Sequence, residues 1–99
     1  MVTLYLHGQV TTSRSALEAF LRRARVVYEE PGGIRTRLQW RDDEPATFVE
    51  IIEYADRATF DADQVRTETD PRMRALLDEW RTHLAGRPRV EVFEEAALT

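Results

Sequence analysis

The residue with the clearest chemical potential in this sequence is His7, because an imidazole with a pKa of about 6.5 exchanges protons at neutral pH. It belongs to an alternating stretch, residues 2–10, in which Tyr5 and Gln9 share its parity. These side chains are expected on the polar face of one strand. A general base is one role for His7, and a hydrogen-bonded histidine in an interface between chains is the alternative.

A second group of polar side chains alternates along residues 34–41. Arg35, Arg37 and Gln39 share one face of that predicted strand. Together with Tyr5 they can hold an anionic or enolic oxygen, because guanidinium and amide groups donate strong hydrogen bonds to such atoms. The alternative is a row of arginines that reach solvent over apolar surface.

Two carboxylates, Glu50 and Glu53, interrupt the otherwise apolar stretch 47–55. This stretch is apolar on both faces, which indicates a strand that is covered on both sides. The pattern leaves open which of its faces meets the helices. One glutamate is expected to be buried or interfacial, where a carboxylate needs a partner, and Arg35 or Arg37 is the expected one.

Three large aromatic residues, Trp40, Tyr54 and Trp80, can line a pocket for an aromatic ligand. For Trp80, which falls in a helical stripe, packing in the core is the alternative. The sequence has no cysteine, and no spacing typical of a metal site, a nucleophile elbow, a phosphate loop or a dinucleotide fingerprint. We therefore predict no metal and no bound cofactor.

Hydrophobic periodicity predicts the elements that position these side chains. Helical stripes predict one helix from Ser15 that ends before Pro31, and a second helical region that is capped by Asp56 and broken at Asp70. A further helix is expected from Pro71 to about Ala85. Alternation predicts four strands, at residues 2–10, 34–41, 47–55 and 89–95.

The order βαββαβ predicts an α+β, ferredoxin-like fold, with the helices on one face of a four-stranded antiparallel sheet. The length of 99 residues indicates a single domain, 1–99. The second face of the sheet would carry the polar groups described above, with Phe93. Because the stretch 47–55 is apolar on that side too, we predict a partner subunit and hence a homodimer.

The amino-acid composition argues against two classes of binding partner, nucleic acids and membranes. The net charge of −4, with both signs interspersed, argues against a general nucleic-acid binder and against an anionic membrane surface. No apolar run approaches the roughly 18 residues of a membrane span, and the N-terminus lacks the pattern of a signal peptide. The expected location is the cytoplasm.

The stretch 48–56, the residues Ala58-Thr59-Phe60, the broken helix and residues 90–94 resemble the dimeric α/β-barrel superfamily. Within it, the nearest likeness is to the antibiotic-biosynthesis-monooxygenase-like domain, and it covers nearly the whole chain. The resemblance implies two sheets that face each other across a dimer. It places a ligand either between sheet and helices or between the two sheets.

The resemblance also implies a cofactor-independent monooxygenase, an oxidoreductase that acts on an electron-rich aromatic or polyketide-like molecule as its own anion. His7 is then the expected base. The expected ligand contacts are Tyr5, Arg37, Gln39, Trp40, Glu53, Tyr54 and Trp80. Haem degradation is disfavoured, because Asp63 stands where many relatives carry a histidine and the sequence contains no asparagine. The alternative function is a non-catalytic dimer that binds a small molecule or is associated with stress.

Overall fold

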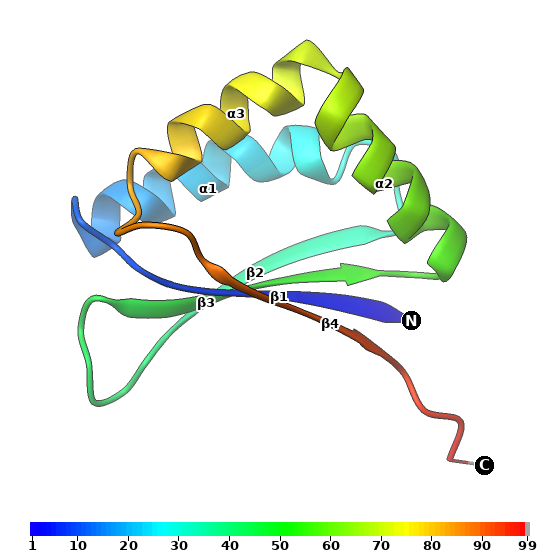
Figure 1. The fold of residues 1–99 in the computed structure, drawn as a ribbon, viewed down its shortest axis with the longest axis horizontal. Helices are drawn as coiled ribbons and strands as arrows, with labels where there is room; N and C mark the ends of the chain where they lie inside the picture. Colours follow the sequence, from blue (N-terminus) through cyan, green and yellow to red (C-terminus); the bar gives the residue numbers. More distant parts are fainter. Residues whose placement is uncertain (99) are drawn as a thin grey trace.

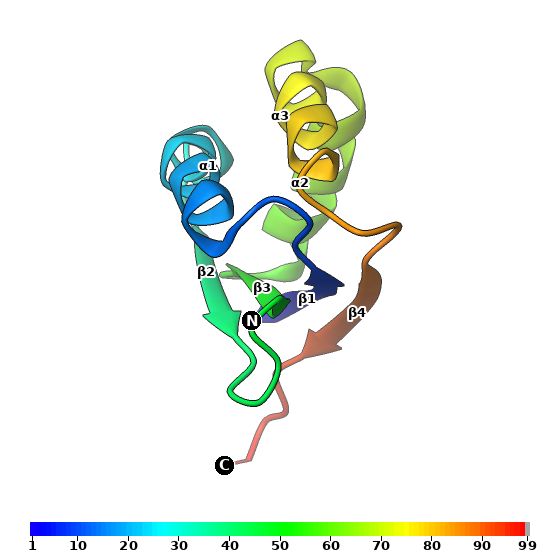
Figure 2. The ribbon, with the colours of Figure 1, turned by 90° about the vertical axis from the view of Figure 1, so that its left-hand side faces the viewer.

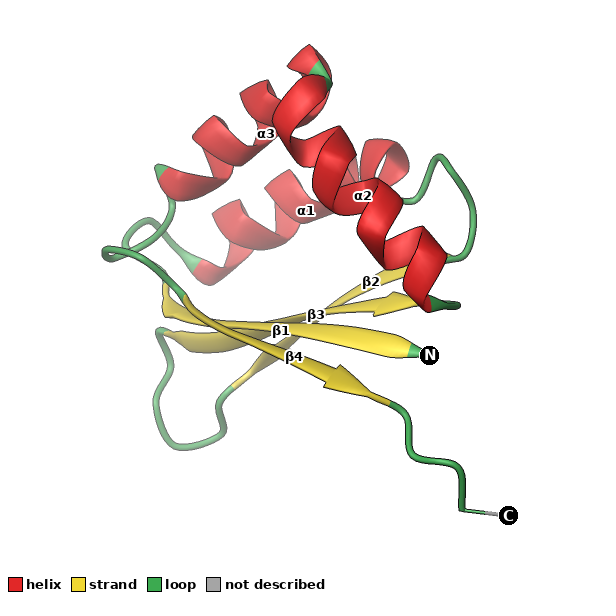
Figure 3. Ribbon diagram, turned by 45° about the vertical axis from the view of Figure 1, so that its right-hand side comes forward, coloured by secondary structure: helices red, strands yellow, loops and turns green. Residues whose placement is uncertain are grey.

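The computed structural model describes residues 1–98, and its strands form one antiparallel sheet in the order β2-β3-β1-β4 (Figure 1). Three helices lie together on one side of this sheet (Figure 3). The predicted ferredoxin-like α+β fold is confirmed. The elements are β1 (Val2–Gln9), α1 (Arg14–Tyr28), β2 (Ile34–Trp40), β3 (Thr47–Tyr54), α2 (Arg57–Thr69), α3 (Pro71–Arg81) and β4 (Arg89–Glu94).

The predicted break in the second helical region is confirmed. α2 ends at Thr69, and α3 begins at Pro71. The side chain of Asp70 caps α3 by accepting a hydrogen bond of 2.8 Å from the backbone N–H of Arg72. Proline fits the first turn of a helix because the missing N–H would have no partner there.

The predicted C-terminal limit of α3 at Ala85 is wrong, because the helix ends four residues earlier, at Arg81. The chain turns there to reach the end of β1. Leu84 forms a bridge with Val10, and the backbone N–H of Ala85 donates to the carbonyl of Gln9 at 2.9 Å. This turn keeps Leu84 in the core, at 8% exposure, without helical geometry.

The register of the sheet settles which face of β3 meets the helices. Phe48, Glu50, Ile52 and Tyr54 lie beneath the helices and are all buried. The residues of opposite parity project from the other side, where Ile51 lies between Tyr5 of β1 and Arg37 of β2. We call this second side the open face. Its residues are Thr3, Tyr5, His7, Gln9, Arg35, Arg37, Gln39, Val49, Ile51, Glu53, Arg89, Glu91 and Phe93.

The helices do not cover the sheet evenly. β2 and β4 form its two edges, and β4 lies at the side away from α1 (Figure 2). Val90 and Val92 share the helix-facing side of the sheet with Leu6 and Leu4, their partners on β1, yet they are 55% and 45% exposed. The layer between sheet and helices is therefore open along β4.

Candidate functional site

A cavity of about 130 Å³ lies in the layer between the sheet and the helices. Most of its wall is apolar. Its lining comes from both layers of the fold: Leu4, Leu6, Tyr28, Ile34, Glu50, Ile52, Tyr54, Asp63, Gln64, Thr67, Met73, Leu77 and Trp80.

The carboxyl group of Glu50 lies in this wall. Its place follows from alternation along β3, because Glu50 has the same parity as Phe48 and Ile52. The residue is 2% exposed, and among residues 1–98 its Oε1 atom has no hydrogen-bond partner. Burial raises the pKa of Glu50 from 4.5 to about 7, and the nearby indole N–H of Trp80 partly offsets this by favouring the carboxylate.

Trp80 reaches the cavity from the opposite layer. It belongs to the apolar stripe of α3 and is 6% exposed. Within the described chain, its Nε1 atom also lacks a hydrogen-bond partner. The cavity wall thus carries one unsatisfied acceptor and one unsatisfied donor, and a native interior rarely leaves such groups unpaired.

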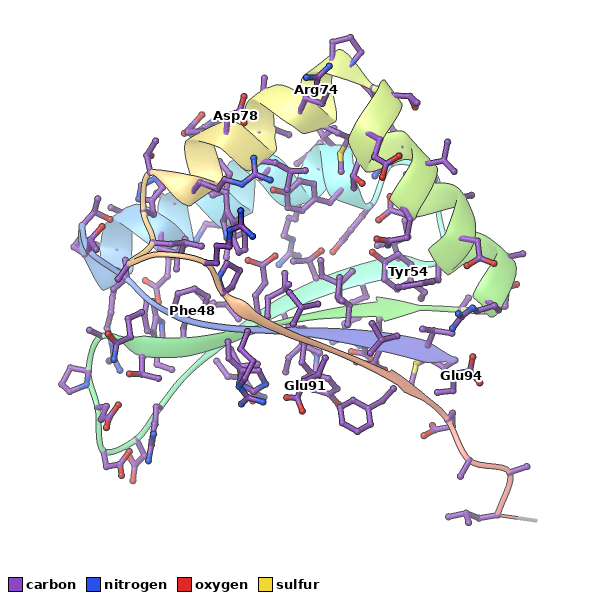
Figure 4. The ribbon with its side chains drawn as sticks, in the orientation of Figure 1. Phe48, Tyr54, Arg74, Asp78, Glu91 and Glu94 are labelled. Carbon is purple, nitrogen blue, oxygen red and sulfur yellow. The ribbon has the colours of Figure 1, made fainter. Side chains whose placement is uncertain are left out.

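A second polar cluster of the cavity wall is internally satisfied. The hydroxyl group of Tyr54 donates to Oδ2 of Asp63 at 2.7 Å, and Nε of Arg66 donates to Oδ1 at 3.0 Å. Figure 4 shows Tyr54 between the sheet and α2. Burial raises the pKa of the Tyr28 and Tyr54 hydroxyl groups far above the usual range, so both stay neutral.

His7 lies elsewhere, on the open face. Its Nε2 atom is 2.7 Å from Oε1 of Glu91, and one third of its side chain is exposed. Glu91 projects from the side of the sheet away from the helices (Figure 4). His7 and Gln39 both line a shallow depression of about 360 Å³ that is open to solvent. The ring of Tyr5 packs between His7 and Phe93, at centroid distances of 6.4 and 5.5 Å.

Arg37, one of the two arginines expected to pair with a buried glutamate, pairs instead with Glu53 on the open face. Nε of Arg37 donates to Oε1 of Glu53 at 2.8 Å on the open face. The expectation that Arg35 or Arg37 would satisfy the buried glutamate is therefore wrong for Glu50, because the arginines of β2 have the opposite parity to the residues beneath the helices.

The eight predicted site residues thus fall into separate places. Tyr54 and Trp80 line the interior cavity. Trp40 lies at the edge of the helix-facing layer, where its indole N–H donates to Glu18 at 3.0 Å, and it also lines the depression of His7 and Gln39. The open face carries the remainder: Tyr5, His7, Arg37, Gln39 and Glu53.

Of the residues that line the cavity, only Tyr54 and Trp80 were predicted as ligand contacts. The polar residues that were not predicted are Tyr28, Glu50, Asp63, Gln64 and Thr67. For Glu50, the sequence feature that could have predicted a place in the cavity wall is an isolated carboxylate in an apolar strand. No sequence feature predicts this for the polar residues of α2, because their approach to the cavity depends on how that helix lies on β3.

Among residues 1–98, no three His, Asp or Glu side chains are grouped so that they could hold a metal ion. No helix in that range is long and apolar enough to cross a membrane.

Solved structures share this fold. SnoaB, a cofactor-independent oxygenase from Streptomyces nogalater, superposes with a TM-score of 0.79 at 16% identity, over 97% of this chain and 93% of that one. An antibiotic biosynthesis monooxygenase gives 0.65 at 19% identity, over 98% and 100% of the two chains. An uncharacterised NIPSNAP domain protein from Burkholderia xenovorans gives 0.74 at 16% identity, over 100% and 98%.

These likenesses confirm the resemblance at the level of the fold, which is that of the antibiotic-biosynthesis-monooxygenase-like proteins. No family model matches the sequence, and no curated protein matches it.

Proposed function

We propose that this protein is a small monooxygenase that oxidises an electron-rich aromatic molecule in the interior cavity, without a bound metal or flavin. The observation that carries the proposal is the pair of buried, unpaired polar atoms, Oε1 of Glu50 and Nε1 of Trp80, in the wall of an otherwise apolar cavity. The cofactor-independent oxygenase SnoaB has the same fold, which supports this class of reaction.

In the proposed reaction Glu50 is the base. A carboxylate with a pKa of about 7 is matched to proton transfer at neutral pH. It takes the proton of a ring hydroxyl, and the anion passes one electron to dioxygen, after which the phenoxyl radical and superoxide combine at the para carbon. The C–O bond forms there, and the peroxide takes the proton back from Glu50.

Loss of water then breaks the O–O bond and leaves a quinone. One oxygen atom of dioxygen enters the product, and the other leaves as water. The substrate is oxidised and dioxygen is reduced, so no further reductant is needed. Trp80 is proposed to donate a hydrogen bond to the ring oxygen as negative charge develops on it.

The proposed active form is a homodimer. On the open face, Phe93 of β4 is 54% exposed, and Val49 and Ile51 of β3 lie on the same face across β1. A second copy that packs on this face would bury the apolar groups and would place His7 in the interface. This supports the interface role for His7, whereas its predicted role as base remains to be tested.

Dioxygen uptake tests the proposal. We expect the purified protein, treated with chelator, to consume dioxygen with a hydroxylated single-ring substrate. With ¹⁸O₂, one labelled atom should appear in the quinone. Heat-denatured protein is the control for autoxidation. If the ring compounds bind but uptake never exceeds that control, the protein is the alternative, a non-catalytic small-molecule-binding dimer.

A further inference from the structure

We infer that the interior cavity selects a neutral single ring with one hydroxyl group, held between Oε1 of Glu50 and Nε1 of Trp80. In naming the substrate class this deepens the proposed function, but it can be tested by binding alone.

The two unpaired groups of the cavity wall are complementary. Glu50 presents an acceptor and Trp80 presents a donor, and both groups lie in the wall of one cavity. A hydroxyl group is the smallest function that donates to one and accepts from the other.

Water alone does not fit the whole space. A water molecule needs two to four polar partners, and a volume of about 130 Å³ has room for several. The remaining wall is largely apolar, with Leu4, Ile52 and Met73 among its residues. An occupant with one polar end and an apolar body satisfies both parts of the wall.

The size of the cavity limits that body. An engineered apolar cavity of about 150 Å³ binds benzene, so a cavity of about 130 Å³ suits one six-membered ring. Two fused rings would have to displace the side chains of α3 or β1. The ligand is thus smaller than a polycyclic aromatic.

Charge excludes a second class of ligand. Asp63 and Glu50 both line the cavity. The guanidinium of Arg66 is engaged by Asp63 and by the carbonyl groups of Val27 and Tyr28. A ligand carboxylate or phosphate would therefore face like charge.

The entry proposed for the ligand is along β4, where the exposed Val92 and Val90 are paired with Leu4 and Leu6 of the cavity wall. On the side of α3, Leu77 and Thr67 are shared with a polar depression. Arg74 and Asp78 lie along α3 beside it (Figure 4).

Calorimetric binding of phenol and of toluene tests the inference, because toluene replaces the hydroxyl group by a methyl group of similar size. We expect Glu50→Gln and Trp80→Phe each to lower the ratio of phenol to toluene affinity by about tenfold, the loss of one charge-assisted or buried hydrogen bond. Because phenol and toluene are similar in size, a general change in packing affects both affinities and cancels in their ratio. Circular dichroism checks that each variant is folded.

The chain offers matched controls. Glu53→Gln matches Glu50→Gln, because it makes the same chemical change on the open face of the same strand. Trp40→Phe matches Trp80→Phe, because it removes an indole outside the cavity. Both should leave the ratio unchanged. We expect phenol affinity to rise between about pH 6 and pH 8, as Glu50 ionises while Tyr28 and Tyr54 stay neutral, and toluene affinity to stay constant. Benzoate and 2-naphthol should not bind.

Several results would overturn the inference: no binding of phenol at millimolar concentration, a ratio unaffected by both cavity variants, or equal binding of benzoate or 2-naphthol. Oxygen uptake separates the two proposals. If phenol binds as expected without uptake, the monooxygenase proposal fails and the inference stands. If uptake occurs and is unaffected by both cavity variants, the inference fails and the oxidation takes place outside the interior cavity, without Glu50 as its base.

Discussion

Glu50 and Glu53 lie three residues apart on β3, yet their carboxyl groups project from opposite faces of the sheet. That of Glu50 is buried beneath the helices with Oε1 unpaired, whereas that of Glu53 accepts a 2.8 Å hydrogen bond from Arg37 on the open face. The carboxyl group of Glu50 meets the interior cavity, and burial raises its pKa to about 7. The two residues therefore form a matched pair for experiment.

We expect Glu50→Gln to change how stability depends on pH. Because burial raises the pKa of Glu50 from 4.5 to about 7, the folded protein keeps a proton in this window that the unfolded chain has released. The free energy of unfolding of the native protein should fall as pH rises through the window, by about 3 kcal/mol at most. Urea unfolding at about pH 5 and about pH 8 should show this fall reduced in Glu50→Gln. An identical fall in Glu50→Gln would contradict the burial of an ionisable group there; Glu53→Gln is the control and should keep the native slope.

His7 and Glu50 are the alternative bases, and turnover distinguishes them. Because His7 lies outside the cavity, we expect His7→Ala to keep kcat/KM within a small factor. Glu50→Gln should lower kcat/KM by about 10²-fold or more, as for a lost general base. The opposite pattern would move the reaction to the open face and restore the role predicted for His7.

We expect Phe93→Glu to separate the proposed homodimer, because it would bury a charge in an apolar interface. Sedimentation velocity at micromolar concentration should show a monomer for this variant and a dimer for the native protein. Val26→Glu is the control, since Val26 is 72% exposed on α1, away from the open face. A native protein that sediments as a monomer would end the dimer proposal.

Ile51→Glu should be more damaging. Ile51 lies on the open face but is already 4% exposed among its neighbours in one chain. A charge there is expected to lower the thermal midpoint as well as to dissociate the dimer. A soluble, folded dimer with Ile51→Glu would show that this part of the open face is not packed against a partner.

Asp70→Ala should destabilise the junction between α2 and α3. The Asp70 side chain accepts a hydrogen bond from the backbone N–H of Arg72, which would otherwise be unsatisfied. We expect a fall in Tm of about 4 to 8 °C, the usual effect of a lost N-cap in a domain of this size. Asp78→Ala removes a carboxylate that makes only an exposed ion pair with Arg81 and should leave Tm nearly unchanged.

Tyr54→Phe should cost about 1 to 3 kcal/mol of unfolding free energy, because it leaves a buried oxygen of Asp63 without its donor. Chemical denaturation measures the loss. Tyr5→Phe removes the same hydroxyl group from the open face and is the matched control. Equal stabilities of the two variants would show that the Tyr54–Asp63 hydrogen bond does not support the cavity wall.

Much of the fold follows from local sequence. Alternation in residues 2–10 and 34–41 fixed the parity of β1 and β2, so the polar residues of the open face could be named in advance. The Asp70-Pro71 pair predicted the break between α2 and α3, because a capping carboxylate and a proline act within one turn. The end of α3 was less predictable, since the contacts of Leu84 and Ala85 with the end of β1 decide it.

The cavity depended on tertiary structure. In β3 both parities are apolar, so alternation alone could not say whether Glu50 or Glu53 would be buried. The choice is made by long-range pairing: β3 lies between β1 and β2, and its register sets Glu50 beside Leu6 and Leu38 beneath the helices. Trp80 lines the same cavity as Glu50 only because α3 packs back over the sheet. Burial and proximity of this kind are non-local, and a sequence pattern reports only local periodicity.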